Sequence, residues 1–227
     1  MVGFVRSRAA PPSVNLMNQI FYDGTIEENF LGHIFAEIYR DGVYRPFLEG
    51  RKDLTIVDCG AHVGIFSIYA SKFAKKILAI EPSPDHFEAL QLNMKPFPIV
   101  ECIQAAIAEK DGKMDLFGND NKTMLSLMPQ VSDPKYKPVQ VTTITLATLL
   151  KDIEHIDFMK LDVEGKEQDI LQGEDFVKVA PKIQEIVLEV HVWNSRHPNQ
   201  IREALKNNGY KVSQIQNDAS LWHAIRI

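Results

Sequence analysis

The sequence predicts an α/β domain with a mostly parallel β-sheet, an antiparallel edge and helices on both faces. From residue 54 onward, short apolar strands alternate with helical segments, the pattern of a parallel sheet that is covered on both sides. The last two predicted strands are separated by a turn alone, which indicates antiparallel pairing at one edge. With 227 residues, 45% of them hydrophobic, the chain is long enough for one such domain and an extension.

We predict two parts, a helical extension at residues 1–52 and the main domain at residues 53–227. In the extension, apolar residues recur at helical spacing between residues 27 and 40, and Asp41-Gly42 ends the segment. This amphipathic helix is expected to pack on its own domain. Covering a cofactor or forming a dimer interface are the alternatives.

The elements of the main domain follow from apolar runs and from the residues that bound them. Ser83 is suited to cap one helix, and Gly173 and Gly209 end two others. The predicted helices are residues 63–74, 84–94, 146–150, 166–171 and 198–208. The predicted strands are residues 54–59, 76–80, 99–106, 113–117, 139–144, 156–161, 183–192, 210–215 and 221–227.

Residues 118–138 are polar and contain three prolines, so they are predicted to form a long loop. We expect this loop to fold over the site as a lid that excludes water, and a surface insertion is the alternative.

The composition excludes several classes of protein. The net charge of -5 gives no global attraction to nucleic acid. Cys59 and Cys102 lie in apolar runs and are expected to be small buried hydrophobes rather than a disulfide. No apolar run approaches the roughly 18 residues of a membrane span, and the N-terminus lacks the apolar core of a signal peptide. We therefore expect a cytoplasmic protein with no membrane partner.

The strongest site signal is the glycine turn after the first strand of the main domain, Val57-Asp58-Cys59-Gly60-Ala61-His62-Val63-Gly64. Gly60 is expected to let the backbone approach a ligand, and Gly64 to let the helix pack closely on its strand. Glu81 ends the next strand about 20 residues further on, where a carboxylate can bind ribose hydroxyls. Together these features predict a cofactor that contains adenosine.

Asp58 distinguishes between two such cofactors. A dinucleotide fingerprint has glycine at this position, and a pyrophosphate near Asp58 would be repelled by about 4 kcal/mol at about 4 Å and an effective dielectric constant of about 20. S-adenosylmethionine has no phosphate, and its ammonium and sulfonium groups favour a carboxylate. The sequence therefore favours S-adenosylmethionine. The alternative is that Asp58 holds the turn by accepting backbone N–H groups. An NAD-linked oxidoreductase and a non-catalytic nucleotide-binding module are the alternative functions.

Several segments resemble the FkbM family of methyltransferases, over about residues 54–192. They are Ile80-Glu81-Pro82-Ser83-Pro84, Thr143-Ile144-Thr145-Leu146 and, most specifically, Lys160-Leu161-Asp162-Val163-Glu164-Gly165. The resemblance implies a Rossmann-like class I methyltransferase fold with seven strands. It also implies methyl transfer, usually to a hydroxyl of a sugar, polyketide or similar metabolite.

The resemblance carries four residues over as contacts of S-adenosylmethionine: Asp58, Gly60, Gly64 and Glu81. We expect residues beside them, and two at the end of the following strand, to contribute to the same pocket: Ala61, His62, Pro82, Ser83, Ala105 and Ala106. For His62 the alternative is that it caps the helix.

Three side chains are candidates for the catalytic centre, where a base must take the proton of a hydroxyl acceptor. Asp162 and Glu164 alternate with apolar residues after Lys160, so all three charges are expected on one side, with Lys160 paired to a carboxylate. His191 lies near the end of a later strand and has a pKa near neutral. The alternatives are that the two acids stabilise the next helix and that His191 is structural.

Asp58, Asp162 and His191 could also meet around a divalent metal, but their spacing is not diagnostic and no metal is predicted. Neither cysteine suits cysteine-based methylation of pyrimidines, and the Asn/Asp-Pro-Pro-aromatic motif of DNA methyltransferases does not follow Leu161. The expected partner is therefore a small hydroxylated molecule rather than DNA, and a homodimer is considered.

Overall fold

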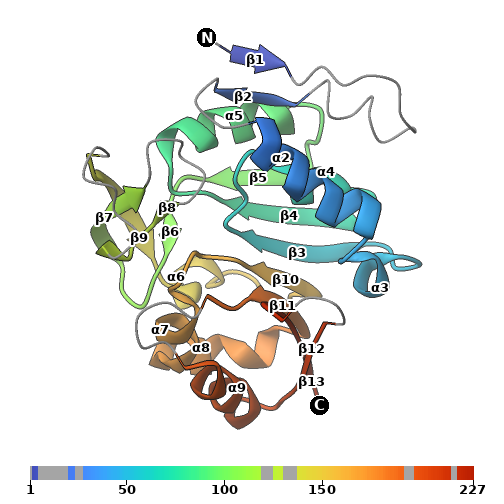
Figure 1. The fold of residues 1–227 in the computed structure, drawn as a ribbon. Helices are drawn as coiled ribbons and strands as arrows, with labels where there is room; N and C mark the ends of the chain where they lie inside the picture. The colour runs from blue at the N-terminus through green and yellow to red at the C-terminus, as the bar shows by residue number, and fades with distance from the viewer. Residues whose placement is uncertain are drawn as a thin grey trace.

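The computed structural model describes residues 2–4, 20–23, 28–118, 125–129, 137–191, 197–215 and 219–227. Its central sheet has seven strands in the order β12-β13-β11-β10-β3-β4-β5 (Figure 1). They are β3 (Leu54–Cys59), β4 (Ala74–Ile80), β5 (Val100–Ile103), β10 (Phe158–Leu161), β11 (Glu185–Glu189), β12 (Tyr210–Gln214) and β13 (Leu221–Arg226).

The predicted combination of parallel strands and an antiparallel edge is confirmed. Strands β11, β10, β3, β4 and β5 pair in parallel. Strand β13 pairs antiparallel with both of its neighbours, β11 and β12. It forms a hairpin with β12, the strand that precedes it in the chain. The hairpin forms one end of the sheet.

Both faces of the sheet are buried, because successive side chains of a strand point to opposite faces. In β3, Ile56 belongs to one core cluster and Val57 to the other. The first cluster includes α4 (Ile65–Ala70) and α5 (Pro84–Met94). The second includes α6 (Leu146–Leu149), α7 (Glu167–Gln172), α8 (Glu174–Val179) and α9 (Pro198–Asn207).

The predicted helix of the extension is present, although residue 27 lies outside the described residues. It is α2 (Glu28–Phe35), which continues as a π-helix, η1 (Ala36–Asp41), and ends at Gly42 with φ +67°. Its buried residues Leu31 and Ile38, and Leu48 of α3 (Arg45–Leu48), join the core cluster of α4. One hydrophobic core therefore contains residues from both sides of the predicted boundary at residue 52. An antiparallel pair, β1 (Val2–Phe4) and β2 (Phe21–Asp23), was not predicted.

A second sheet, also not predicted, contains β6 (Ala106–Ile107), β9 (Val139–Ile144), β7 (Gly112–Gly118) and β8 (Leu125–Ser126) in that order. The prediction of one strand over residues 99–106 is wrong. Strand β4 ends opposite Ile103, so the chain has no neighbour beyond that point and Ala106–Ile107 pairs with β9 instead. The break between β5 and β6 opens space at the carboxyl ends of the strands.

One smaller difference has a local cause. The predicted helix at residues 63–74 is shorter because Gly64 has φ +92°, a left-handed conformation outside the helix. Within the part of the chain that is described, no helix is both long and apolar enough to cross a lipid bilayer.

Candidate active site

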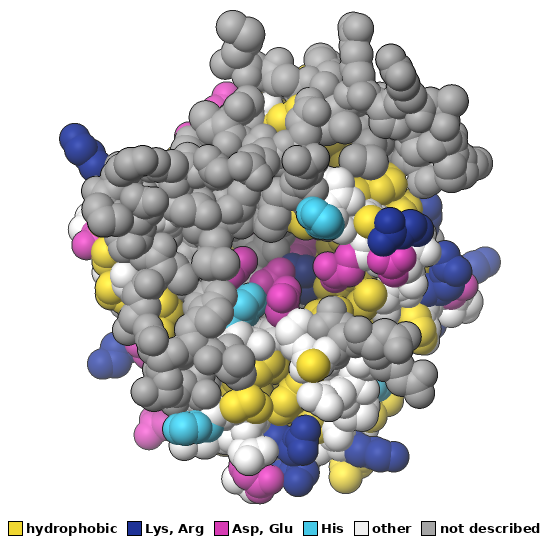
Figure 2. All heavy atoms as spheres, in the orientation of Figure 1, with side chains coloured by type: hydrophobic (Ala, Val, Ile, Leu, Met, Phe, Trp, Pro, Cys, Tyr) yellow, Lys and Arg dark blue, Asp and Glu magenta, His cyan; other side chains and the backbone are white. Residues whose placement is uncertain are grey.

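Two adjoining cavities open at the carboxyl ends of β3, β4 and β10, where ligands bind in open α/β sheets. They have volumes of about 710 and 1140 Å³, counted with the open space at their mouths. Both are lined by Ile34, Gly60, His62, Asp162 and Glu164. Figure 2 shows acidic and histidine side chains gathered in a hollow on this face.

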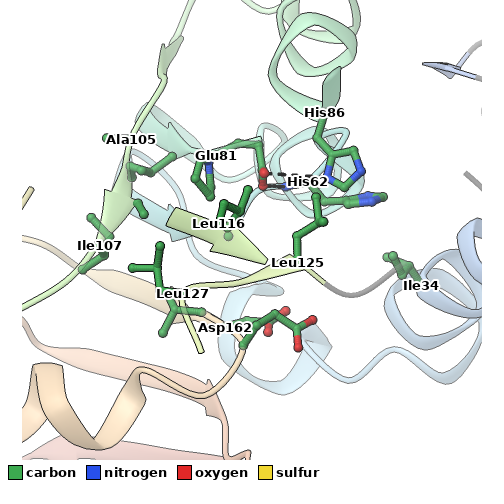
Figure 3. Close-up of a pocket in the computed structure, with 16 residues that line it drawn as sticks. Ile34, His62, Glu81, His86, Ala105, Ile107, Leu116, Leu125, Leu127 and Asp162 are labelled. Carbon is green, nitrogen blue, oxygen red and sulfur yellow. Dashed lines mark hydrogen bonds and ion pairs between the residues drawn. The ribbon is translucent and has the colours of Figure 1, made fainter. Parts of the chain in front are cut away.

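The first cavity combines apolar walls with one buried carboxylate, Glu81 (Figure 3). Its apolar residues include Ile80, Ala105, Ala106, Ile107, Leu116, Leu125 and Leu127. Leu125 and Leu127 come from the predicted lid loop, so the described part of that loop does reach the site. Residues 119–124 and 130–136 of the loop lie outside the described residues, and closure of a lid stays a prediction.

Glu81 is 5% exposed and fixed by hydrogen bonds from two backbone groups. Its Oε2 accepts from His62 N at 2.9 Å (Figure 3). Its Oε1 accepts from Ser83 N at 2.9 Å. His86 Nδ1 lies 3.6 Å from Oε1. Since each carboxylate oxygen has two lone pairs, Glu81 can also accept from a ligand's hydroxyls.

The two glycines of the turn are required by contacts within the protein. A Cβ at Gly60 would lie 1.9 Å from the backbone oxygen of Asp162, and Gly60 has φ +81°. A Cβ at Gly64 would lie 2.7 Å from Met94 Cε and 2.8 Å from Leu90 Cδ1. The prediction that Gly64 serves packing on its own strand is therefore wrong, because the close neighbour is helix α5. Gly60 brings the ends of β3 and β10 together.

Asp58 lies beneath the cavities rather than in their walls. It is completely buried, its Oδ2 accepts a hydrogen bond from Ser67 Oγ at 2.7 Å, and its Oδ1 lies 3.7 Å from Lys160 Nζ. Burial raises the pKa of Asp58, against the lowering effects of Lys160 and Ser67. The charge that was expected to distinguish a sulfonium from a phosphate is therefore already paired inside the protein.

Asp162 presents its carboxylate to both cavities. Its Oδ2 accepts from Lys160 Nζ at 3.0 Å, which confirms the predicted lysine–carboxylate pair. Lys160 also donates to the backbone oxygen of Gly60 at 3.0 Å. Although burial alone lowers the pKa of Lys160, Asp162 and Asp58 raise it well above its usual value. The other oxygen of Asp162, Oδ1, is buried and has no hydrogen-bond partner among the described residues.

Glu164 and His191 meet in the second cavity, with His191 Nε2 3.4 Å from Glu164 Oε2. Burial, followed by the charge of Asp162, raises the pKa of Glu164 to about 8. Burial alone lowers the pKa of His191, but its hydrogen bond to Glu167 and the neighbouring carboxylates raise it to about 9. The two groups therefore hold protons more tightly than an ordinary glutamate or histidine does.

Glu167 orients His191 and was not predicted as a site residue. It is completely buried, and its Oε1 lies 2.9 Å from His191 Nδ1. The same oxygen accepts backbone N–H groups from Val163 and Gly165, at 3.3 and 3.1 Å. An acid in the first turn of a predicted helix was the available signal, because such a residue can bind the free N–H groups of the preceding turn.

The structure brings most of the predicted site residues together. Those that line one or both cavities are Gly60, Ala61, His62, Glu81, Pro82, Ala105, Ala106, Asp162, Glu164 and His191. The other three, Asp58, Gly64 and Ser83, support the site from behind. Ser83 caps α5, as predicted, by accepting from His86 N at 3.4 Å.

A sequence profile described as the methyltransferase FkbM domain matches residues 58–212, more than half of the chain. The chain belongs to the FkbM methyltransferase family. This FkbM protein is therefore an S-adenosylmethionine-dependent methyltransferase with the Rossmann-like fold that the sequence predicts. The assignment favours methyl transfer over the NAD-linked and non-catalytic alternatives.

Characterised relatives of this FkbM protein are similar over most of its length. It is 30% identical over 169 residues to Methyltransferase 1 of Beauveria bassiana (strain ARSEF 2860), covering 63% of this chain and 66% of that protein. It is 26% identical over 219 residues to Methyltransferase sdnD of Sordaria araneosa, covering 80% and 82%. Among solved structures, precorrin-6y C5,15-methyltransferase from Geobacter metallireducens GS-15 aligns with a TM-score of 0.49 at 16% identity, covering 82% and 88%.

Proposed function

We propose that this protein transfers the methyl group of S-adenosylmethionine to a hydroxyl of a small metabolite, with the cofactor in the first cavity and the acceptor in the second. The observation that carries the proposal is the contrast between two adjoining cavities. Asp162 and Glu164 line both cavities. Otherwise the first is mostly apolar around one fixed carboxylate, Glu81, whereas the second adds the charged groups Lys160, Glu189 and His191.

The residues of the first cavity suit an adenosine. Glu81 has lone pairs left for ribose hydroxyls, and Ala105, Leu116 and Leu127 offer apolar surface to the flat face of a base. Asp162 lines both cavities, so its carboxylate lies where the cofactor and the acceptor would meet.

When bound, S-adenosylmethionine supplies the methyl group: a bond forms between the acceptor oxygen and the methyl carbon while the carbon–sulfur bond breaks and leaves its electron pair on sulfur. Glu189, in the polar wall of the second cavity, receives the proton that the hydroxyl loses. Ile34 and Ile38 of the extension form part of the opposite wall and exclude water.

Calorimetric titration tests the cofactor half of the proposal. We expect the demethylated product S-adenosylhomocysteine to bind with micromolar affinity and NAD not to bind. Glu81→Gln should weaken the product's binding by about tenfold or more, because a charge-assisted hydrogen bond contributes about 1.5–3 kcal/mol. Glu101→Gln, which removes an exposed acid of β5 paired to Lys76, is the matched control and should bind normally. Binding of NAD without binding of S-adenosylhomocysteine would contradict the proposal.

Mass spectrometry tests the acceptor half. The protein is incubated with S-adenosylmethionine and a panel of sugars, polyketides and small alcohols, matched with the corresponding amines and thiols. Methylation of alcohols supports the proposal, and methylation confined to amines or thiols contradicts it.

A further inference from the structure

We propose that Asp162, Glu164 and His191 bind a divalent cation, and that this cation holds the acceptor's hydroxyl oxygen. The cation site is a claim about these side chains alone, whereas its use in methyl transfer rests on the proposed function. One ligand atom from each of the three residues lies within 4.8 Å of the other two.

The first argument is the chemistry of the three ligands. Two carboxylates and one imidazole form a mixed oxygen–nitrogen set, which suits first-row divalent cations. They come from two chain segments, the turn after β10 and the end of β11, which the parallel pairing of these strands brings together. Three protein ligands leave coordination positions open for a substrate oxygen or water.

The second argument is the way His191 is held. Because an ionised carboxylate can only accept, the 2.9 Å contact makes His191 Nδ1 the donor to Glu167, and Glu167 is fixed by two backbone N–H groups. A buried carboxylate that binds one ring nitrogen is the usual support of a metal-binding histidine. The other nitrogen, Nε2, faces Glu164 at 3.4 Å and Glu189 at 3.7 Å.

The third argument is the balance of charge. Asp162, Glu164 and Glu189 line one cavity with two basic groups, Lys160 and His191, and Lys160 is shared between Asp162 and the buried Asp58. Asp162 Oδ1 is buried and makes no hydrogen bond to any described residue. A cation between these groups would satisfy that oxygen and reduce the repulsion among the carboxylates.

The cation would act on the acceptor before methyl transfer. The hydroxyl oxygen binds at an open position, the positive charge favours ionisation of the hydroxyl, and the proton leaves to Glu189, which is outside the ligand set. The ionised oxygen then forms its bond to the methyl carbon as described above.

Binding of Mn²⁺ to the full chain, stripped with a chelator and desalted, tests the site without any acceptor. Calorimetry should give one Mn²⁺ per chain, and pulsed electron paramagnetic resonance should show nitrogen coupling from an imidazole ligand. We expect His191→Gln to abolish the nitrogen coupling and to weaken binding at least 30-fold, and Glu164→Gln to weaken it similarly. Glu167→Gln, which removes the charge that supports His191 but no proposed ligand, should weaken it by about tenfold.

Glu189→Gln is the matched control, because it removes the same charge from the same cavity without removing a proposed ligand. It should weaken Mn²⁺ binding by less than threefold. Circular dichroism and thermal unfolding verify that each variant is folded. Absence of Mn²⁺ binding, or equal weakening by Glu189→Gln and Glu164→Gln, would overturn the site. Titration of S-adenosylhomocysteine in the same samples separates that outcome from a failure of the proposed function.

Discussion

Acidic residues lie at both ends of strand β11 and just after the carboxyl end of its neighbour β10, and those at the two ends differ in how fully they are paired. At the amino end, Glu185 accepts from Arg51 Nη1 at 2.6 Å through one oxygen and lies 2.7 Å from His223 Nε2 through the other. At the carboxyl end, Asp162, Glu164 and Glu189 line a cavity in which Lys160 and His191 are the neighbouring basic groups.

The fully paired acid at the amino end stabilises the fold, whereas the acids at the carboxyl end are available to bind ligands. Arg51 belongs to the extension and His223 to β13, so Glu185 joins three parts of the chain. The carboxyl-end acids are not needed for such a junction, because the backbone contact of Gly60 with Asp162 and the bonds of Glu81 already connect the strand ends. Acidic groups that exceed the needs of folding are typical of functional sites.

The largest expected effect concerns turnover at the carboxyl end. Glu164→Gln should lower methyl transfer about 1000-fold, because it removes a carboxylate that acts on the acceptor. Its free energy of unfolding should not fall, since the variant relieves repulsion from Asp162. A radiolabelled methyl-transfer assay and urea unfolding measure the two quantities. Turnover within threefold of the wild type would remove Glu164 from the catalytic centre.

Glu185→Ala should lower stability and leave methyl transfer unchanged, the opposite of what we expect for Glu164→Gln. We expect the free energy of unfolding to fall by about 2–3 kcal/mol, because Arg51 and His223 lose their shared partner, although the partial exposure of Arg51 limits the loss. Turnover at a temperature well below the unfolding transition should be unchanged. Glu101→Gln is the control for an exposed pair and should change stability by less than about 0.5 kcal/mol. A normal stability for Glu185→Ala would show that the pairing at the amino end is dispensable.

The pH dependence of stability gives a smaller effect at the same residue. Burial raises the pKa of Glu185, but hydrogen bonds with His223 and Arg51 outweigh it, so the pKa is lowered in the folded protein. The stabilising charge is therefore complete above the unfolded pKa of about 4.3 and is lost as the pH falls through the lower folded pKa. The advantage of the wild type over Glu185→Gln should shrink between pH 5 and pH 3 in urea unfolding. An advantage that grows on acidification would contradict this assignment.

The sequence predicted the parts of the site that are fixed by strand ends. Asp162 and Glu81 lie where strands end, and period-two alternation placed Lys160 beside a carboxylate. The reason for Gly60 could not be predicted, because the atom that excludes a side chain belongs to Asp162, about 100 residues away along the chain. Asp58 was misplaced for the same reason, since its partner Lys160 comes from a neighbouring strand.

The fold, too, has parts that the local sequence predicts and parts that depend on residues elsewhere in the chain. Long periodic segments predicted the central sheet, the helix α5 and two strands of the second sheet, β7 and β9. That these form a separate sheet was missed, because β6 and β8 contain only two residues each. A strand of two residues is too short to show a period in the sequence. The partner of β6, strand β9, is also not its neighbour in the chain, so no local pattern indicates their pairing. The part of the predicted lid that contacts the site, Leu125 to Leu127, depends on this second sheet.

The smallest expected effect concerns the attachment of that segment to the catalytic turn. Ser126 Oγ donates to the backbone oxygen of Glu164, a residue held at φ +53°, and accepts from Met128 N at 3.0 Å. Ser126→Ala should weaken binding of S-adenosylhomocysteine by about three- to tenfold, about 1 kcal/mol, because Leu125 and Leu127 are then held less firmly against the first cavity.

Thr143→Val is the matched control for Ser126→Ala, since Thr143 Oγ1 donates to Lys110 O at 2.9 Å in the same second sheet and lines neither cavity. Both variants lose a hydroxyl-to-carbonyl bond, and Ser126→Ala also loses the bond from Met128 N, so both should lose stability, but only Ser126→Ala should lose cofactor affinity. Equal affinities in calorimetry would mean that the second sheet stabilises the domain without shaping the site. Its role would then resemble that of Glu185 at the amino end rather than that of the acids at the carboxyl end.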